Sequence, residues 1–360
     1  MQRKIFTGFS LAASTIFCVL FVINKSAASD AAFNGMILAS TVVIPAVFPF
    51  LAAANFICEL TLNIKSRALN FFARILFKLP GVALIPIFTG FLAGYPEGVR
   101  GAAHLYEGGK ISQKQAEVIT MFAVCAGPAF IIKAVGYGML GSFHAGVLLF
   151  AAHILSALIL AIILPRIFLR DTCKHKNEAV SSNQSNVPAK RQNLTDLFCE
   201  SVANASRAML VIVGFIAIFS VIIALIQTYS SGAIYNAAPM ILEVTTGTQF
   251  AAENNPSLPL ISAIMAFSSL SVIFQLLTFG RKIKINPLKF IGARLSHAAL
   301  AAVIIIPLER LFPITAPVWS AGPHGAIHLP SVPIPAAIAL VLMGVTLLIS
   351  FKIKKTPLEN

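Results

Sequence analysis

Apolar stretches separated by short polar segments extend through nearly the whole chain. Eight of them approach or exceed the length of about 20 residues that an α-helix needs to cross a bilayer. They are Ile5–Ile23, Met36–Leu60, Ile119–Leu140, His144–Ile167, Met209–Thr228, Leu258–Leu277, Phe290–Leu308 and Pro335–Phe351. The composition agrees, since 57% of residues are hydrophobic and only 11% are charged. We therefore predict an all-α polytopic membrane protein with about eight transmembrane helices.

Two shorter apolar segments are interrupted by glycine and a carboxylate. The first reads GFLAGYPEGVRG, at Gly90–Gly101, and the second reads LEVTTGTQ, at Leu242–Gln249. Broken backbone at membrane depth survives only where protein or water satisfies its polar groups. A matching pair of interrupted segments in two halves of a chain is typical of the binding site of repeat-built transporters. We expect two broken or re-entrant segments here.

Basic residues are concentrated in every second polar loop, and this bias predicts the topology. Of the 27 lysines and arginines, 24 fall in Arg3–Lys4, Lys65–Lys78, Arg100–Lys114, Arg166–Arg207, Arg281–Arg294 and Lys352–Lys355. Such loops are retained in the cytoplasm, so both termini are expected there, in a bacterial cytoplasmic membrane. The net charge of +14 then points to anionic lipid headgroups as partners, and not to a nucleic acid.

The first apolar stretch also has features of a secretion signal. MQRK precedes it and the small residues of KSAAS follow it, as in a cleavable signal peptide. Its apolar part is long for a signal but adequate for a span. We expect a retained helix, with cleavage as the alternative.

The predicted order of elements divides the chain into two related halves. A polar linker at 170–205, with an amphipathic end, separates a first repeat at 36–169 from a second at 206–308. Residues 1–35 form an additional N-terminal helix, and 309–360 hold a proline-rich external loop and the last helix. Each half reads span, broken segment, span, span, in opposite orientations. This order predicts an inverted-topology repeat.

Several motifs carry a resemblance to a known family. They are VFPFLAA (Val47–Ala53), GFLAGYPEGVRGAAHLYEGGKISQKQAE (Gly90–Glu117), CAGPAFIIKAVGYGMLGS (Cys125–Ser142), GFIAIFSVI (Gly214–Ile222), LEVTTGT (Leu242–Thr248) and SSLSVIFQ (Ser268–Gln275). The chain resembles the YlbJ-like sporulation integral membrane proteins, within the nucleoside-recognition (Gate) domain group. The resemblance implies a spore-forming bacterial source and kinship with nucleoside and ion transport systems, but it supplies no substrate.

Glu243 is the sharper of two candidate site carboxylates. It lies in an apolar run and is followed by the hydroxyls of Thr245, Thr246 and Thr248. A carboxylate, hydroxyls and freed carbonyls form a site for a hard cation or a solute hydroxyl. The structural alternative is a helix end capped by its own side chains.

Glu97 is the second candidate, beside Gly94 and Tyr95 in the first interruption. A carboxylate at membrane depth is costly unless it is paired or hydrated, although Glu97 also fits a surface position beside Arg100. Small and polar residues on the following spans are expected to line the same site, although such residues are more often packing contacts. They are Gly127, Pro128, Ser269, Ser271 and Gln275.

These features favour a transporter or permease for a small polar solute, with a nucleoside-like solute and ion coupling as narrower expectations. The alternative is a membrane scaffold in spore-envelope assembly that transports nothing. No nucleophile, Walker or dinucleotide motif is present in the sequence, so we expect neither an enzyme nor a cofactor. The five cysteines match no metal spacing, and a homo-oligomer remains open.

Overall fold

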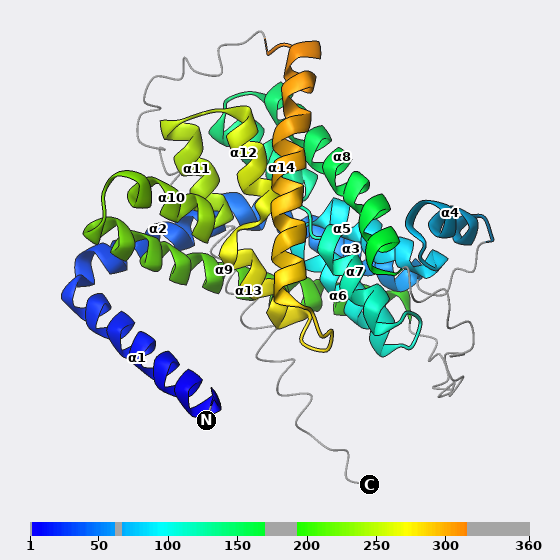
Figure 1. The fold of residues 1–360 in the computed structure, drawn as a ribbon, viewed down its shortest axis with the longest axis horizontal. Coiled ribbons are helices and arrows are strands. Elements are labelled where there is room, and N and C mark those ends of the chain that lie inside the picture. The colour runs from blue at the N-terminus through cyan, green and yellow to red at the C-terminus, as the bar shows by residue number, and fades with distance from the viewer. Residues whose placement is uncertain (1, 62–66, 170–192, 315–360) are drawn as a thin grey trace.

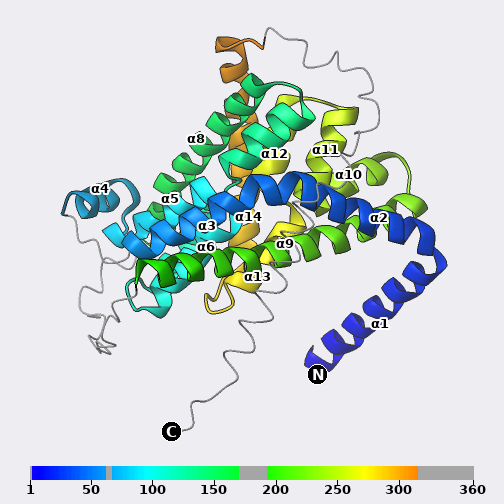
Figure 2. The same cartoon turned by 180° about the vertical axis from the view of Figure 1, so that it is seen from behind.

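The computed structural model describes residues 2–61, 67–169 and 193–314, in which all regular elements are helices (Figures 1 and 2). Helix α1 (Gln2–Ile23) extends away from the body of the molecule in both views. The other helices pack together, and their buried apolar side chains form one large cluster and two smaller ones. The predicted all-helical class is therefore confirmed for these residues.

The first half contains nine helical segments between α1 and its last long helix. In chain order they are α2 (Lys25–Leu38), the π-helical η1 (Ala39–Val43), α3 (Ile44–Thr61), α4 (Arg67–Phe77), the short 3₁₀ turn η2 (Gly81–Ala83), α5 (Leu84–Ala93), α6 (Tyr95–Glu107), α7 (Gln113–Phe122) and the π-helical η3 (Ala129–Met139). Helix α8 (Phe143–Phe168) completes this half. The segments α2, η1 and α3 follow one another directly, so the predicted boundary at residue 35 falls within a helix.

The second half has fewer and more regular helices. They are α9 (Leu194–Tyr229), α10 (Gly232–Leu242), α11 (Val244–Asn254), α12 (Leu258–Phe267), α13 (Ser269–Phe279) and α14 (Pro287–Leu311). The amphipathic end of the predicted linker is the first part of α9, because that helix is continuous over 36 residues. The rest of the linker lies outside the described residues.

Two pairs of short helices form hairpins at the predicted interruptions. In the first, Gly90 contacts Gly98 and Gly101 contacts Pro86, so α5 and α6 run antiparallel about a tip at Gly94. Gly94 has φ of 107°, a conformation that favours glycine. In the second pair, α10 and α11 meet at Glu243. Both predicted breaks are present, and each is a turn between two helices.

Two stretches that we predicted to be continuous spans are also broken. Ile119–Leu140 is divided between α7 and η3 by the non-helical residues 123–127, where Pro128 disfavours a helical conformation of Gly127. Leu258–Leu277 is divided at Ser268, which has φ of 73°, next to Ser269 with φ of 55°. Left-handed serines are uncommon, and no glycine or proline announces this break. Each half therefore contains a long helix, a hairpin, a broken helix and a second long helix.

The number of spans differs from the prediction of about eight. Within the described residues, five helices are long and apolar enough to cross a membrane, or six if the bent pair Arg67–Phe77 and Gly81–Ala93 counts as one. The five are Lys25–Ile57, Phe143–Phe168, Leu194–Tyr229, Leu258–Phe279 and Pro287–Leu311. Pro335–Phe351 lies outside the described residues, and the count of eight is not confirmed.

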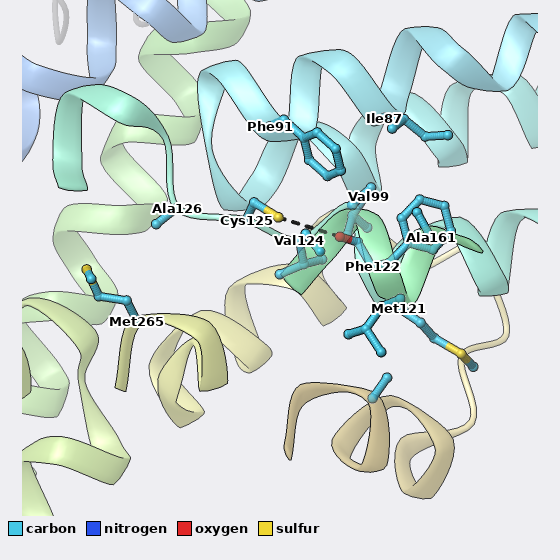
Figure 3. Packing of buried hydrophobic residues seen from close by; sticks show 14 of the residues in the cluster. Ile87, Phe91, Val99, Met121, Phe122, Val124, Cys125, Ala126, Ala161 and Met265 are labelled. Carbon is cyan, nitrogen blue, oxygen red and sulfur yellow. Dashed lines mark hydrogen bonds between the residues drawn. The ribbon is translucent and has the colours of Figure 1, made fainter. Parts of the chain in front are cut away.

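Glycines allow the first hairpin to pack against the break between α7 and η3. Gly90 and Gly98 both face the Ala123 backbone. Around this contact lie the buried side chains of Phe91, Val99 and Phe122 (Figure 3). Because hydrocarbon drives membrane helices together only weakly, small residues that let backbones approach closely are the usual basis of such packing.

We predict that Gly98→Ala destabilises the protein. A Cβ at Gly98 would lie 2.9 Å from the Cβ of Ala123, and overpacking of this kind costs about 1–3 kcal/mol. Thermal unfolding of detergent-solubilised protein should therefore occur at a lower temperature. The control is Gly214→Ala in α9, where a Cβ meets nothing within 4 Å. A midpoint that falls equally in both variants would contradict the proposed contact.

Candidate functional site

A small cavity lies where the two hairpin tips and the two broken helices meet. Its volume is about 50 Å³, which suffices for a few water molecules. It is lined by Val43, Val47, Ala93, Gly94, Tyr95, Pro96, Gly127, Phe130, Ile212, Ile216, Glu243, Val244, Thr245, Val272 and Gln275. Residues from both halves of the chain, more than a hundred positions apart, therefore enclose one space.

The first hairpin tip is held against both broken helices. Gly127 lies so close to the end of α5 that a Cβ there would be 3.0 Å from the Leu92 carbonyl oxygen. The Tyr95 hydroxyl donates a hydrogen bond of 2.8 Å to the Met265 carbonyl oxygen, near the C-terminal end of α12. A side chain at the tip of one hairpin thus satisfies a carbonyl of the helix that is broken in the other half.

The second hairpin tip places a buried carboxylate at the cavity. Glu243 is 1% exposed and is the N-cap of α11, where its side chain accepts a hydrogen bond of 2.7 Å from the Thr246 amide. Within the described residues no lysine, arginine or histidine forms an ion pair with it. The capping alternative is therefore real, and it leaves a buried carboxyl group without a cationic partner among the described residues.

Polar side chains on α13 complete the wall of the cavity. Gln275 lines it and donates from Nε2 to the Ser271 hydroxyl at 3.2 Å. Ser269, at the start of α13, is buried, and its hydroxyl has no hydrogen-bond partner among the described residues. Together with its left-handed backbone, this makes the start of α13 a strained segment, and such segments cluster at functional sites.

Six of the twelve predicted site residues line the cavity. They are Gly94, Tyr95, Gly127, Glu243, Thr245 and Gln275. The other six do not line it; they are Glu97, Pro128, Thr246, Thr248, Ser269 and Ser271. Thr248 instead donates to the Val244 carbonyl oxygen within α11. The binding roles of all twelve residues stay predictions.

Glu97 lies in a different place from the one expected. It is 4% exposed and forms an ion pair of 2.8 Å with Arg100. Both residues line a separate polar cleft of about 350 Å³ between α3, α6, α9 and α13. Glu97 and Glu243 therefore line two different spaces, and their expected joint role in one site stays a prediction.

A second buried polar cluster was missed in the sequence. Arg294 on α14 is completely buried; it donates to the Val124 carbonyl oxygen and contacts Nδ1 of His297. His297 contacts the His153 carbonyl oxygen through Nε2 at 3.1 Å, and Nε2 of His153 accepts from the Ala126 amide at 3.0 Å. The cluster therefore links α14 and α8 to the α7–η3 break.

Arg294 was counted among the basic residues of a cytoplasmic loop, and the structure corrects this. The sequence did contain a signal for this cluster, which is an arginine and a histidine three residues apart at one end of an apolar stretch. A charged residue within a membrane span indicates a candidate functional site. Cys125, for which we expected no metal role, lies beside the two histidines, and one ligand atom from each lies within 4.8 Å of the others. Figure 3 shows Cys125 between Val124 and Ala126 in the same break.

Comparisons with known proteins yielded one informative relative. No family model matches the chain, and no solved structure matches it. The sporulation integral membrane protein YlbJ of Bacillus subtilis is 25% identical over 336 residues, which cover 83% of this chain and 82% of the relative. The similarity spans most of both chains and agrees with the apolar helices described above. It supports the YlbJ-like resemblance read from the motifs: the chain is similar to an integral membrane protein of sporulation, and its place in the Gate domain group stays a prediction.

Proposed function

We propose that this protein is a secondary transporter or permease of a small polar solute, and that the cavity between the hairpin tips is its solute site. The observation that carries the proposal is the meeting of three backbone breaks, at Gly94, Gly127 and Glu243, around one cavity, whose wall the fourth broken helix joins through Val272 and Gln275. Discontinuous helices whose ends face a shared site are characteristic of transporters built from repeats.

The chemistry of the cavity suits a neutral solute that carries hydroxyl groups. Helices α6 and α11 begin at its wall, so their N-terminal amides and positive dipole ends are directed toward it. The Glu243 carboxylate, the Gln275 amide and Thr245 add side chains that bind hydroxyl groups. A nucleoside-like solute, the narrower expectation drawn from kinship with nucleoside transport systems, meets these requirements through its sugar.

The size of the cavity indicates a closed conformation. Ligand pockets usually measure about 300–1,000 Å³, and this cavity has about 50 Å³. Movement of a solute therefore requires one hairpin tip to separate from the helices that it contacts. Because each tip is attached through only two short helices, we propose that the two hairpins act as gates.

We further propose that the two halves form an inverted-topology repeat, with α5 and α6 entering from the cytoplasm and α10 and α11 from outside. Both termini then lie in the cytoplasm, and the basic loops face anionic headgroups. Opposite orientations allow one hairpin to open toward each side of the membrane, as alternating access requires.

The Bacillus relative is a sporulation integral membrane protein, which supports a role in sporulation. This role also favours the second candidate, a scaffold in spore-envelope assembly. A scaffold requires the cytoplasmic linker and not the cavity. Deletion of residues 170–192 should therefore abolish a scaffold's contribution to spore formation, whereas Glu243→Gln should preserve it. A transporter should give the opposite result.

The proposed topology predicts that the two hairpins are labelled from opposite sides. In a variant whose native cysteines are replaced by alanine, Asn255→Cys after α11 should react with a membrane-impermeant maleimide on intact cells. Lys114→Cys after α6 should react only once the membrane is permeabilised. Both positions are exposed, so access decides the result. Labelling of both from the same side would exclude the inverted repeat.

Loss of the Glu243 charge should impair transport. We expect Glu243→Gln to reduce uptake of radiolabelled uridine into proteoliposomes by tenfold or more, because the cavity loses its only carboxylate. The matched control is Glu253→Gln, at the exposed end of the same helix, which should change uptake by less than twofold.

Because Glu243 also caps α11, the uptake experiment must include a check that each variant folds. Loss of an N-cap costs about 1 kcal/mol, so size-exclusion profiles and thermal unfolding accompany each uptake measurement, and Glu243→Asp retains the charge. Equal uptake by the wild type and by folded Glu243→Gln would remove Glu243 from the mechanism. Wild-type protein that moves neither uridine nor adenosine would contradict a nucleoside-like solute.

A further inference from the structure

Arg294 is a fully buried cation without a carboxylate partner in the part of the chain that the structure describes. A buried charge is strongly destabilising unless other groups compensate it. The contacts of Arg294 therefore show which neighbouring groups compensate its charge. Its side chain is also the bulkiest of those that are fully buried, so it fills a place that the fold has formed around it.

The compensating groups belong to the broken end of α7. Nη1 of Arg294 donates to the carbonyl oxygen of Val124, two residues beyond the end of that helix. A helix C-terminus carries about half a negative charge on its unpaired carbonyls. The guanidinium therefore lies where the backbone itself provides negative potential.

A chain of hydrogen bonds holds the guanidinium at this position. Arg294 contacts Nδ1 of His297, Nε2 of His297 reaches the His153 carbonyl oxygen, and Nε2 of His153 accepts from Ala126. Val124 and Ala126 lie on the same break. The chain of contacts starts and ends on that segment, so α8 and α14 fix the cation against it.

The same contacts argue against a metal at the neighbouring Cys125, His153 and His297, although these residues offer donor atoms that zinc uses. A metal needs the free lone pair of a neutral imidazole. Nε2 of His153 already accepts an amide proton, and Nδ1 of His297 faces the Arg294 guanidinium. A fixed positive charge beside the cluster further disfavours a divalent ion.

A second buried ionisable group without an ion-pair partner among the described residues lies in the same core. Tyr95, which lines the cavity, lies near both Arg294 and Glu243. Glu243 has no cationic partner and Arg294 no anionic partner among the described side chains, whereas Glu97 and Arg100 neutralise each other elsewhere. Tyr95 therefore lies near one buried carboxyl group and one buried guanidinium.

We propose that Arg294 is a built-in cation that takes the place of a coupling ion at the α7–η3 break, so that this protein binds no sodium or other metal cation there. The inference rests on the proposed transport function, which it narrows to transport without a metal cation as co-substrate. Broken helices in transporters commonly coordinate sodium through freed carbonyls, and here a side chain performs that role.

The salt dependence of unfolding tests the proposal without any transport assay. The full-length protein in detergent is heated in equal concentrations of sodium, potassium or choline chloride. The wild type should unfold at the same temperature in all three. Arg294→Gln should unfold at a lower temperature and regain a few degrees in sodium or potassium relative to choline, because the Val124 carbonyl then needs an external cation.

Arg166→Gln is the matched control, since Arg166 donates to the Leu76 and Ile75 carbonyl oxygens from an exposed position. It should lower the unfolding temperature equally in all three salts. Arg294→Lys keeps the charge and should remain insensitive to the cation, which also provides a folded variant if Arg294→Gln does not fold.

Three results would overturn the proposal. The first is a wild type that sodium stabilises over choline, or that binds radioactive sodium. The second is Arg294→Gln that is destabilised without any dependence on the cation. The third is stoichiometric zinc or copper in the purified wild type, which requires Arg294 to leave the cluster. A wild type that fails to move uridine contradicts the proposed transport but leaves these measurements valid.

Discussion

The structure depends on one constraint, which is that broken helices buried away from water must find partners for their free amides and carbonyls. An interrupted helix leaves several such groups at each end, and each is costly in an apolar environment. Three interruptions meet at one small cavity in this protein, and the fourth broken helix joins its wall. Many of the polar contacts in the core satisfy amides or carbonyls that an interruption leaves free.

Different side chains meet this requirement at different breaks. Glu243 caps the amides at the start of α11, and His153 accepts the free amide of Ala126. On the carbonyl side, Tyr95 donates to the end of α12 and Arg294 to the end of α7. Each of these residues stabilises the fold, and two of them, Tyr95 and Glu243, also place hydrogen-bonding groups at the cavity wall. Stability and the proposed site chemistry therefore rest on shared contacts.

Local sequence was sufficient where one residue type dictates the backbone. Glycine before tyrosine and proline marks the first hairpin tip at Gly94, and a carboxylate in an apolar run marks the second tip at Glu243. The break at Ser268 had no comparable signal, because serine adopts a left-handed conformation only when surrounding contacts impose it. That Glu97 and Glu243 line different spaces could not be read from the sequence for a related reason, since the direction of a side chain after a turn depends on packing.

The sequence by itself determined that this is a helical membrane protein, because apolar length and charge bias act locally and need no fold to be recognised. It also determined where two hairpins turn. Only the tertiary structure decided which distant residues enclose the cavity, and that Arg294 is buried at the α7–η3 break and is not part of a cytoplasmic loop. Burial and pairing arise from contacts between segments as far apart as Val124 and Arg294, and no local pattern encodes such contacts.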